Sequence, residues 1–238
     1  MLSRNSAQTI LNGDKGLQDR LSVLRLASSI NPLFSNPAIA GGFIRDTLLG
    51  FLPADCDVIF NGYCRNQPGI SECVVKAESQ LKLGPFSDWE FENVTATGVS
   101  GNMQQDVVGV YSNYTDWLTM AMCVAESGEA FFGAKTLDHI SNRSYDIRFQ
   151  GIAVWMGFRQ RTYWRALGGV ASRGMYLCHK LKLTPTTESM AVFLKYDEIL
   201  SHLDSAERDG LLKWFSYKVR NLPDFGDTLR RFGVTAFS

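Results

Sequence analysis

The chain has 238 residues, and its 24 Lys and Arg residues balance 24 Asp and Glu residues, so its formal net charge is zero. This balance argues against a protein that binds nucleic acid over its whole surface, and no apolar run is long enough to span a membrane. With 45% apolar residues, the chain can form one large domain or a head with a small second unit.

The N-terminus lacks the apolar run of a signal peptide. The cysteines are odd in number and scattered, at Cys56, Cys64, Cys73, Cys123 and Cys178. We therefore expect free thiols and a cytoplasmic protein. The histidines stand alone in the sequence, which argues against structural zinc.

The first elements lead to a glycine turn. An amphipathic helix is expected over residues 17–30, and a short apolar strand over 38–40. Gly41 and Gly42 follow this strand, where they permit a tight turn and leave backbone N–H groups open to an anion. The helix expected over 43–49 directs its positive end at the same turn.

Two aspartates then begin the next apolar run, residues 58–60. The two-residue spacing of Asp55 and Asp57 places both carboxylates on one face of a strand, where they repel each other unless a cation binds between them. Such oxygen ligands suit Mg²⁺ better than zinc. A Gly-Gly pair alone is often only a turn and Asp-x-Asp only a solvated strand edge, but the joined block favours nucleotidyl transfer.

Residues 89–95 alternate large apolar and acidic side chains, the period of a half-buried strand. Glu90 and Glu92 fall on the same face of this strand. They can supply a third carboxylate to the site, or they can simply form the solvated side of the strand.

The joined block resembles the head domain of the tRNA nucleotidyltransferases, which include the CCA-adding enzymes and related poly(A) polymerases of the DNA-polymerase-β-like superfamily. The resemblance rests on the pattern Gly-Gly-x-x-Arg-Asp…Asp-x-Asp, matched here by Gly41, Gly42, Arg45, Asp46, Leu49, Gly50, Pro53, Asp55 and Asp57. It implies that the glycines contact a nucleoside triphosphate and that Asp55 and Asp57 bind two Mg²⁺ ions, with Mn²⁺ as an alternative.

The same resemblance implies further site residues. Residues 91–95 are similar to the family's Phe-Glu-Ile-Thr-Thr stretch, which makes Glu92 the third metal ligand and Glu90 the alternative. Arg45 is expected to contact the nucleotide, although in the first turns of a helix it can also be a surface or scaffold residue. Asp116 belongs to a segment similar to the family's Arg-Arg-Asp-Phe-Thr block, and Arg165 to one similar to its neck helix, so both are expected to bind the nucleotide.

Two departures from the family pattern bear on the substrate. Tyr114 and Thr115 replace the two arginines before Asp116. Where the family has Glu-Asp-x-x-Arg, the motif that selects CTP and ATP, this chain has Phe158, Arg159 and Thr162. The base preference therefore stays unassigned.

A basic segment with interleaved aromatic residues follows the head. Between Arg143 and Lys182 the sequence contains eight cations and a single acid, Asp146. The cations are Arg143, Arg148, Arg159, Arg161, Arg165, Arg173, Lys180 and Lys182, and the aromatic residues are Trp155, Phe158, Tyr163, Trp164 and Tyr176. The segment can hold an RNA and stack its terminal bases, or its aromatic residues can be helix core and its arginines a solvated face.

We expect an α+β fold, with a nucleotidyltransferase head of helices around a mixed sheet at residues 1–150 and a small all-helical region at 151–238. Helices are expected over 187–199 and 205–219, and a turn over 223–226. The activity expected is template-independent, metal-dependent transfer of a nucleotide from an NTP to an RNA 3′ end, with tRNA favoured. Alternatives are transfer to a protein hydroxyl, a toxin that modifies tRNA, and a non-catalytic module that binds nucleotide or RNA.

Overall fold

The computed structural model describes residues 1–61, 69–94, 104–105, 108, 121–147 and 162–235. The chain divides into two compact units. Unit 1 comprises Met1–Ser112 and Leu118–Ser141, and unit 2 comprises Asn113–Trp117 and Asn142–Ser238. Among the described residues, no helix is both long and apolar enough to cross a membrane.

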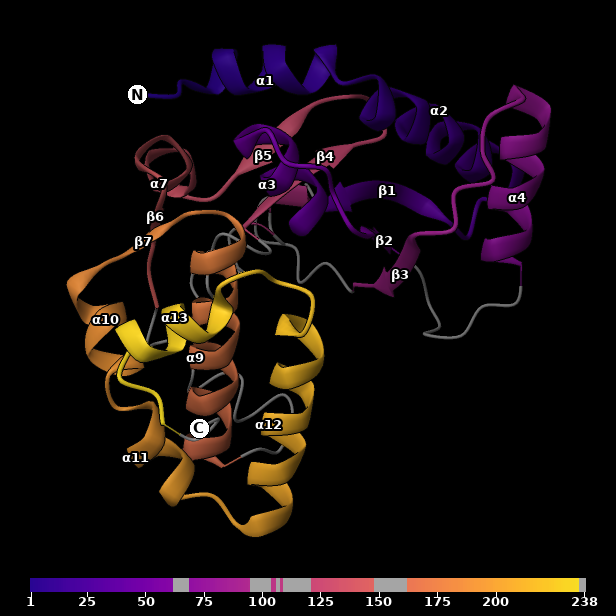
Figure 1. The fold of residues 1–238 in the computed structure, drawn as a ribbon. Coiled ribbons are helices and arrows are strands. Elements are labelled where there is room, and N and C mark those ends of the chain that lie inside the picture. The colour runs from indigo at the N-terminus through magenta and orange to yellow at the C-terminus, as the bar shows by residue number, and fades with distance from the viewer. Residues whose placement is uncertain (62–68, 95–103, 106–107, 109–120, 148–161, 236–238) are drawn as a thin grey trace. The chain divides into compact units, whose positions relative to one another are not determined.

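Unit 1 is built on a mixed sheet in the order β3-β2-β1-β4-β5 (Figure 1). β2 and β3 are parallel, whereas β1 pairs antiparallel with both β2 and β4. The mixed sheet and its flanking helices confirm the expected fold class. The strands are β1 (Ser35–Ala40), β2 (Cys56–Asn61), β3 (Trp89–Asn93), β4 (Met122–Ala125) and β5 (Ala130–Phe132).

The helices of unit 1 include three that the sequence did not predict, α1, α4 and α7. The helix expected over residues 17–30 is present as α2, which begins two residues earlier because the Asp14 carboxylate accepts a hydrogen bond from the Leu17 N–H and caps the helix. α2 packs against α4 and β1 (Figure 1). The bounds are α1 (Arg4–Gly13), α2 (Lys15–Ile30), α3 (Gly42–Leu49), α4 (Ile70–Leu81) and α7 (Thr136–Asn142).

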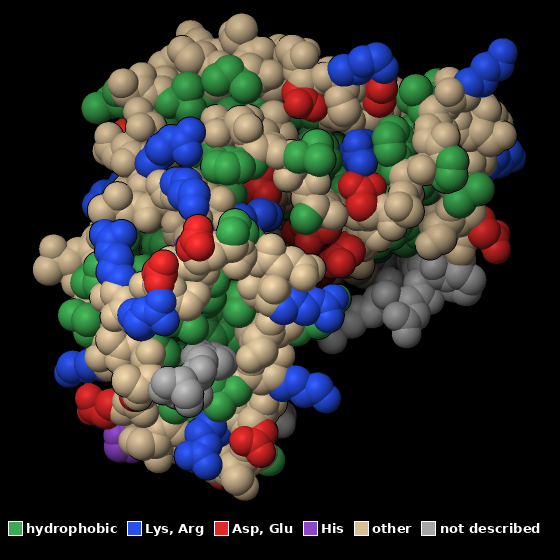
Figure 2. Space-filling view, in the orientation of Figure 1, with side chains coloured by type: hydrophobic (Ala, Val, Ile, Leu, Met, Phe, Trp, Pro, Cys, Tyr) green, Lys and Arg blue, Asp and Glu red, His purple; other side chains and the backbone are tan. Residues whose placement is uncertain are grey.

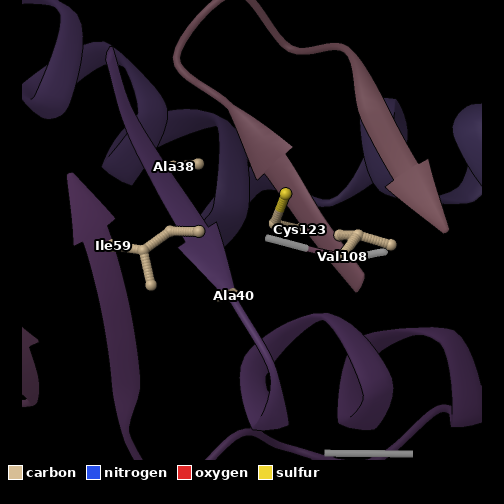
Figure 3. Close-up of a cluster of buried hydrophobic side chains, with 5 residues drawn as sticks. All are labelled: Ala38, Ala40, Ile59, Val108 and Cys123. Atoms are coloured by element: carbon tan, nitrogen blue, oxygen red, sulfur yellow. The ribbon is translucent and has the colours of Figure 1, made fainter. Parts of the chain in front are cut away.

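Strand parity divides the apolar side chains of the sheet into two cores. On one face, Phe34 packs against Phe60 and Phe91, with ring centroids 5.2 and 6.0 Å away. Cys56 shares the parity of Phe60 and is fully buried, which confirms that it faces away from the flanking aspartates. The other face carries Ala38, Ala40, Ile59 and Cys123, against which Val108 packs (Figure 3).

Unit 2 is a helical assembly around α9 (Tyr163–Lys180). α10, α11, α12 and α13 all contact α9. The helices are α10 (Thr187–Phe193), α11 (Tyr196–Ser201), α12 (Ser205–Val219) and α13 (Phe225–Arg231), and a short parallel pair joins β6 (Ser144–Tyr145) to β7 (Thr184–Pro185).

Two expected elements of unit 2 differ from the structure. The single helix expected over residues 187–199 is broken between α10 and α11, where the Lys195 N–H bonds to the Val192 carbonyl three residues back and so tightens the last turn. The turn expected over 223–226 instead leads into α13, which begins after Asp224 in the left-handed conformation. α12 has the predicted bounds, with the Asp204 carboxylate as its cap.

Candidate functional site

The two aspartates lie at the start of β2, on the face of the sheet that also carries Ala40. Asp57 pairs in register with Ala40 of β1 on one side and with Glu90 of β3 on the other. Asp55 has the parity of Asp57, and both carboxylates are partly exposed. The fold therefore keeps the two side chains on one face, open to solvent and to a ligand.

The glycine turn lies beside Asp55. Gly41 has φ 63° and ψ −121°, a conformation that favours glycine, and it ends β1 and caps α3 without a side chain. A Cβ placed on Gly42 would lie 3.5 Å from Asp55 Oδ1 and 3.6 Å from Arg45 Nη2. The turn, one carboxylate and the Arg45 guanidinium thus meet around Gly42.

The backbone at this turn distinguishes the two glycines. The Gly41 N–H donates to the Met122 carbonyl at 3.1 Å, so the prediction that glycine amides bind phosphate rests on Gly42. Within the described part of the chain, the N–H groups of Gly42, Phe43 and Ile44 have no acceptor. These are the free donors of the first turn of α3, where the helix dipole also favours an anion.

Arg45 forms a buried ion pair with its neighbour Asp46. Its Nε and Nη2 lie 2.7 and 2.5 Å from Asp46 Oδ1, and the two residues are only 5% and 2% exposed. This geometry matches the scaffold alternative for Arg45, because the guanidinium is buried and paired with the carboxylate of its neighbour in α3. A contact between Arg45 and a nucleotide stays a prediction.

The register of β2 and β3 distinguishes the two candidate third carboxylates. Glu90 is the register partner of Asp57, and Glu92 is the partner of Ile59, one step further along the same face. Both glutamates are exposed. Across the described residues, no three Asp, Glu, His or Cys side chains approach closely enough to hold a metal ion by themselves.

Two cysteines lie close to the aspartates without adding a metal ligand. Cys123 is paired with Ala40 and belongs to the buried apolar cluster of this face (Figure 3). Burial raises the pKa of its thiol well above the usual range. Burial likewise raises the pKa of Cys56, with Arg20 opposing the shift. Both thiols therefore stay protonated and uncharged at neutral pH.

Comparison with known proteins agrees with this geometry. No protein-family model and no curated protein sequence matches the chain. Solved structures do match: a CCA-adding enzyme complexed with ATP at 15% identity and a TM-score of 0.59, and a tRNA nucleotidyltransferase complexed with a primer tRNA and an ATP analogue at 14% and 0.55. A third is the Thermotoga maritima CCA-adding enzyme complexed with tRNA, at 13% and 0.54.

The chain has the fold of the CCA-adding enzymes and tRNA nucleotidyltransferases. The alignments cover 92%, 89% and 92% of this chain but only 51%, 59% and 53% of the three matched chains, so this nucleotidyltransferase fold spans roughly half of those proteins' length. The resemblance inferred from the sequence motif is confirmed at the level of fold.

Several other predicted site residues lie outside the described part of this nucleotidyltransferase fold. Asp116, with Tyr114 and Thr115, lies outside the described residues, as do Phe158 and Arg159. Their expected contacts stay predictions.

Arg165 belongs to unit 2, near the start of α9. Its backbone N–H donates to the Thr162 hydroxyl that caps the helix, while its guanidinium Nη1 is buried without a hydrogen-bond partner in the described structure. Nη1 therefore has no acceptor among the described residues, and the expected contact of Arg165 with a nucleotide stays a prediction.

The basic segment is only partly described. Arg143, Arg173 and Lys182 are exposed, which agrees with a charged surface. Trp164 instead stacks on His202 with ring centroids 4.0 Å apart, so this aromatic residue has a packing role within unit 2.

The sequence analysis missed the contacts that hold the start of β3 in place. Arg20 of α2 donates from Nη2 to both carboxylate oxygens of Asp88, at 2.9 and 2.7 Å, and its guanidinium lies 4.2 Å from the Phe86 ring centroid. The Asp88 carbonyl accepts a hydrogen bond from Cys56 N–H, which joins the starts of β2 and β3. No local pattern signals this pairing, because Arg20 and Asp88 are 68 residues apart.

Proposed function

We propose that this chain is a template-independent, metal-dependent nucleotidyltransferase that transfers a nucleoside monophosphate from an NTP to an acceptor hydroxyl and releases pyrophosphate. The observation that carries the proposal is the place of Asp55 and Asp57 on one strand face, beside the Gly41–Gly42 turn at the start of α3. A carboxylate pair and free helix amides at one point suit a triphosphate and its cation.

The donor set fits Mg²⁺. Asp55 and Asp57 offer hard carboxylate oxygens, whereas Cys56 faces the opposite side of the sheet and Cys123 is buried in an apolar cluster, so neither thiol is presented to a metal beside the aspartates. Mg²⁺ is commonly bound by one or two protein carboxylates together with substrate phosphates and water. A nucleotide would therefore complete a site that the described side chains do not complete alone.

Different groups of the chain have different roles in the proposed reaction. The amides of Gly42, Phe43 and Ile44 bind and orient the phosphates, while Asp55, Asp57 and either Glu90 or Glu92 hold two Mg²⁺ ions. When bound, the ions would lower the pKa of the attacking hydroxyl and neutralise the negative charge on the departing pyrophosphate. Gly42 has no side chain, which leaves the approach to Asp55 open for the triphosphate.

We further propose an RNA 3′ end as the acceptor, with tRNA favoured. The support is the fold, since two of the matched structures are described as complexes with tRNA and two as complexes with ATP or an ATP analogue. The nucleotide transferred is left open, because the residues that stand in place of the family's base-selecting motif lie largely outside the described structure.

The test is transfer of label from each α-labelled NTP to total RNA in the presence of Mg²⁺. We expect label in a discrete RNA band with wild type, and none with the Asp55→Ala/Asp57→Ala variant. A matched control, Glu72→Gln at an exposed carboxylate of α4, should label RNA like wild type. Absence of label from RNA, with folded proteins, would contradict the RNA acceptor, and label in added protein would identify a protein hydroxyl instead.

A further inference from the structure

The outward face of α12 carries two exposed aromatic rings. Trp214 is 37% exposed and Tyr217 is 58% exposed, and their spacing of three residues places them side by side on the helix. Leu211 and Phe215 form the buried side of α12, which adjoins Trp214. The two rings are therefore available to a ligand outside unit 2.

Cations flank both rings. Lys213 lies one turn before Tyr217, Lys218 lies one turn after Trp214, and the Arg220 guanidinium is 4.3 Å from the Tyr217 ring centroid. No Asp or Glu occurs between residues 210 and 223. Figure 2 shows Lys and Arg side chains projecting from the segment labelled α12 in Figure 1. Residues 210–223 thus carry a net positive charge although the whole chain is neutral, and the nearest acid on this face is Asp209, one turn before Lys213.

We propose that this face of α12 binds single-stranded nucleic acid. Bases stack on the Trp214 and Tyr217 rings, and Lys213, Lys218 and Arg220 contact the phosphates, as in sites that combine aromatic platforms with a positive surface. Trp, Tyr and Arg are enriched at protein interfaces as well, whereas lysine is depleted there, so Lys213 and Lys218 favour a nucleic acid over a protein partner. This binding goes beyond the proposed function, since it requires neither a metal nor an NTP.

The test is fluorescence anisotropy with a labelled twelve-nucleotide oligo(A), as RNA and as DNA, without Mg²⁺ or NTP. Removal of both rings in the Trp214→Ala/Tyr217→Ala variant should raise Kd roughly tenfold or more, because each stacked base contributes substantially to affinity. The Trp214→Phe/Tyr217→Phe variant keeps both rings and should bind like wild type. Leu194→Ala, at an exposed apolar residue between α10 and α11, is the matched control and should also bind like wild type.

Salt dependence tests the role of the lysines separately. The Lys213→Gln/Lys218→Gln variant should reduce the slope of log K against log salt by roughly 0.7 for each phosphate of the single strand that is no longer neutralised. The proposal is overturned if wild type does not bind the oligonucleotide, or if the variant without the rings binds as tightly as wild type.

Two further variants separate this surface from the nucleotidyltransferase site. Asp57→Asn should bind oligo(A) normally, and the variant without the rings should keep Mg²⁺-dependent NTP binding. Failure of oligonucleotide binding alone would therefore leave the proposed function intact, and failure of NTP binding alone would leave the α12 surface intact.

Discussion

Asp57 of β2 and Glu90 of β3 are register partners on adjacent parallel strands. Their side chains therefore leave the same face of the sheet one strand apart, about 4.8 Å in the hydrogen-bonding direction. Glu92 is displaced from Asp57 by one repeat along the strand. The register thus favours Glu90 as the third carboxylate, although the sequence resemblance favours Glu92.

This relationship predicts unequal effects for two matched substitutions. Glu90→Gln should lower kcat/KM for nucleotidyl transfer by about tenfold or more, because it removes the carboxylate paired in register with Asp57, and Glu92→Gln should have a smaller effect. Both glutamates are exposed, so neither change should unfold the protein. The measurement is initial rate against Mg²⁺ concentration, and a larger loss with Glu92→Gln would assign the role to Glu92.

Breaking the buried ion pair of Arg45 and Asp46 should greatly reduce the stability of the protein. Asp46→Asn should lower the free energy of unfolding by about 3 kcal/mol, because it leaves the Arg45 guanidinium buried opposite a neutral group. The control is Asp19→Asn, which breaks an ion pair with Lys15 whose side chain is 85% exposed and should cost only about 0.5 kcal/mol. Urea denaturation measures both, and equal losses would contradict the structural role of the buried pair.

Substitution by alanine should have opposite effects on stability at two glycines of α9. A Cβ on Gly174 would lie 2.7 Å from Tyr145 Cε1 and 2.8 Å from Phe193 Cζ, two fully buried rings, so Gly174→Ala should destabilise by about 1–3 kcal/mol. A Cβ on Gly169 would meet nothing within 4 Å, so Gly169→Ala should stabilise the helix by up to about 1 kcal/mol. Urea midpoints test the pair, and a stable Gly174→Ala protein would contradict the close packing.

The sequence predicted the local elements of the head well because short-range chemistry determines them. Gly41 requires a turn, and parity alone placed Cys56 opposite the aspartates, whereas the Asp14 cap of α2 was not predicted. The sequence could not decide between Glu90 and Glu92, because the register of β3 against β2 joins two segments that are far apart in the chain and no local pattern signals it. The register of one strand against its neighbour depends on the tertiary structure, whereas the alternation of side chains between the two faces follows from the two-residue period of any strand.

Two further features of the structure, an interruption between helices and a buried ion pair, also had no signal in the sequence. The interruption between α10 and α11 occurs in a segment without glycine or proline, so no residue type signals it. The ion pair of Arg45 and Asp46 was equally hidden, since adjacent residues in a helix do not ordinarily face each other. Burial of the pair becomes visible only when α3 is packed within unit 1.

Tyr196 predicts how stability changes at alkaline pH. Burial raises its pKa to about 12, with the hydrogen bond to Ser172 opposing the shift. The unfolded tyrosine has a pKa of about 10, so the folded state holds the proton more tightly, and the resulting stabilisation is complete below pH 10 and lost as the pH rises towards 12.

The measurement is the urea midpoint of Tyr196→Phe and wild type at pH 9 and pH 11. Tyr196→Phe should lose less stability between these values than wild type, because it has no phenol to ionise. The control Tyr217→Phe, at an exposed ring, should follow the wild-type profile. Parallel profiles for Tyr196→Phe and wild type would contradict the assignment.

The central claim is that Asp55, Asp57 and the Gly42 turn bind a metal-linked triphosphate, and the most direct measurement is titration calorimetry of a non-hydrolysable NTP analogue with and without Mg²⁺. The account predicts Mg²⁺-dependent binding to wild type that is lost in Asp57→Asn, while Glu72→Gln binds like wild type. Binding that is independent of Mg²⁺, or that survives in a folded Asp57→Asn protein, would contradict the account.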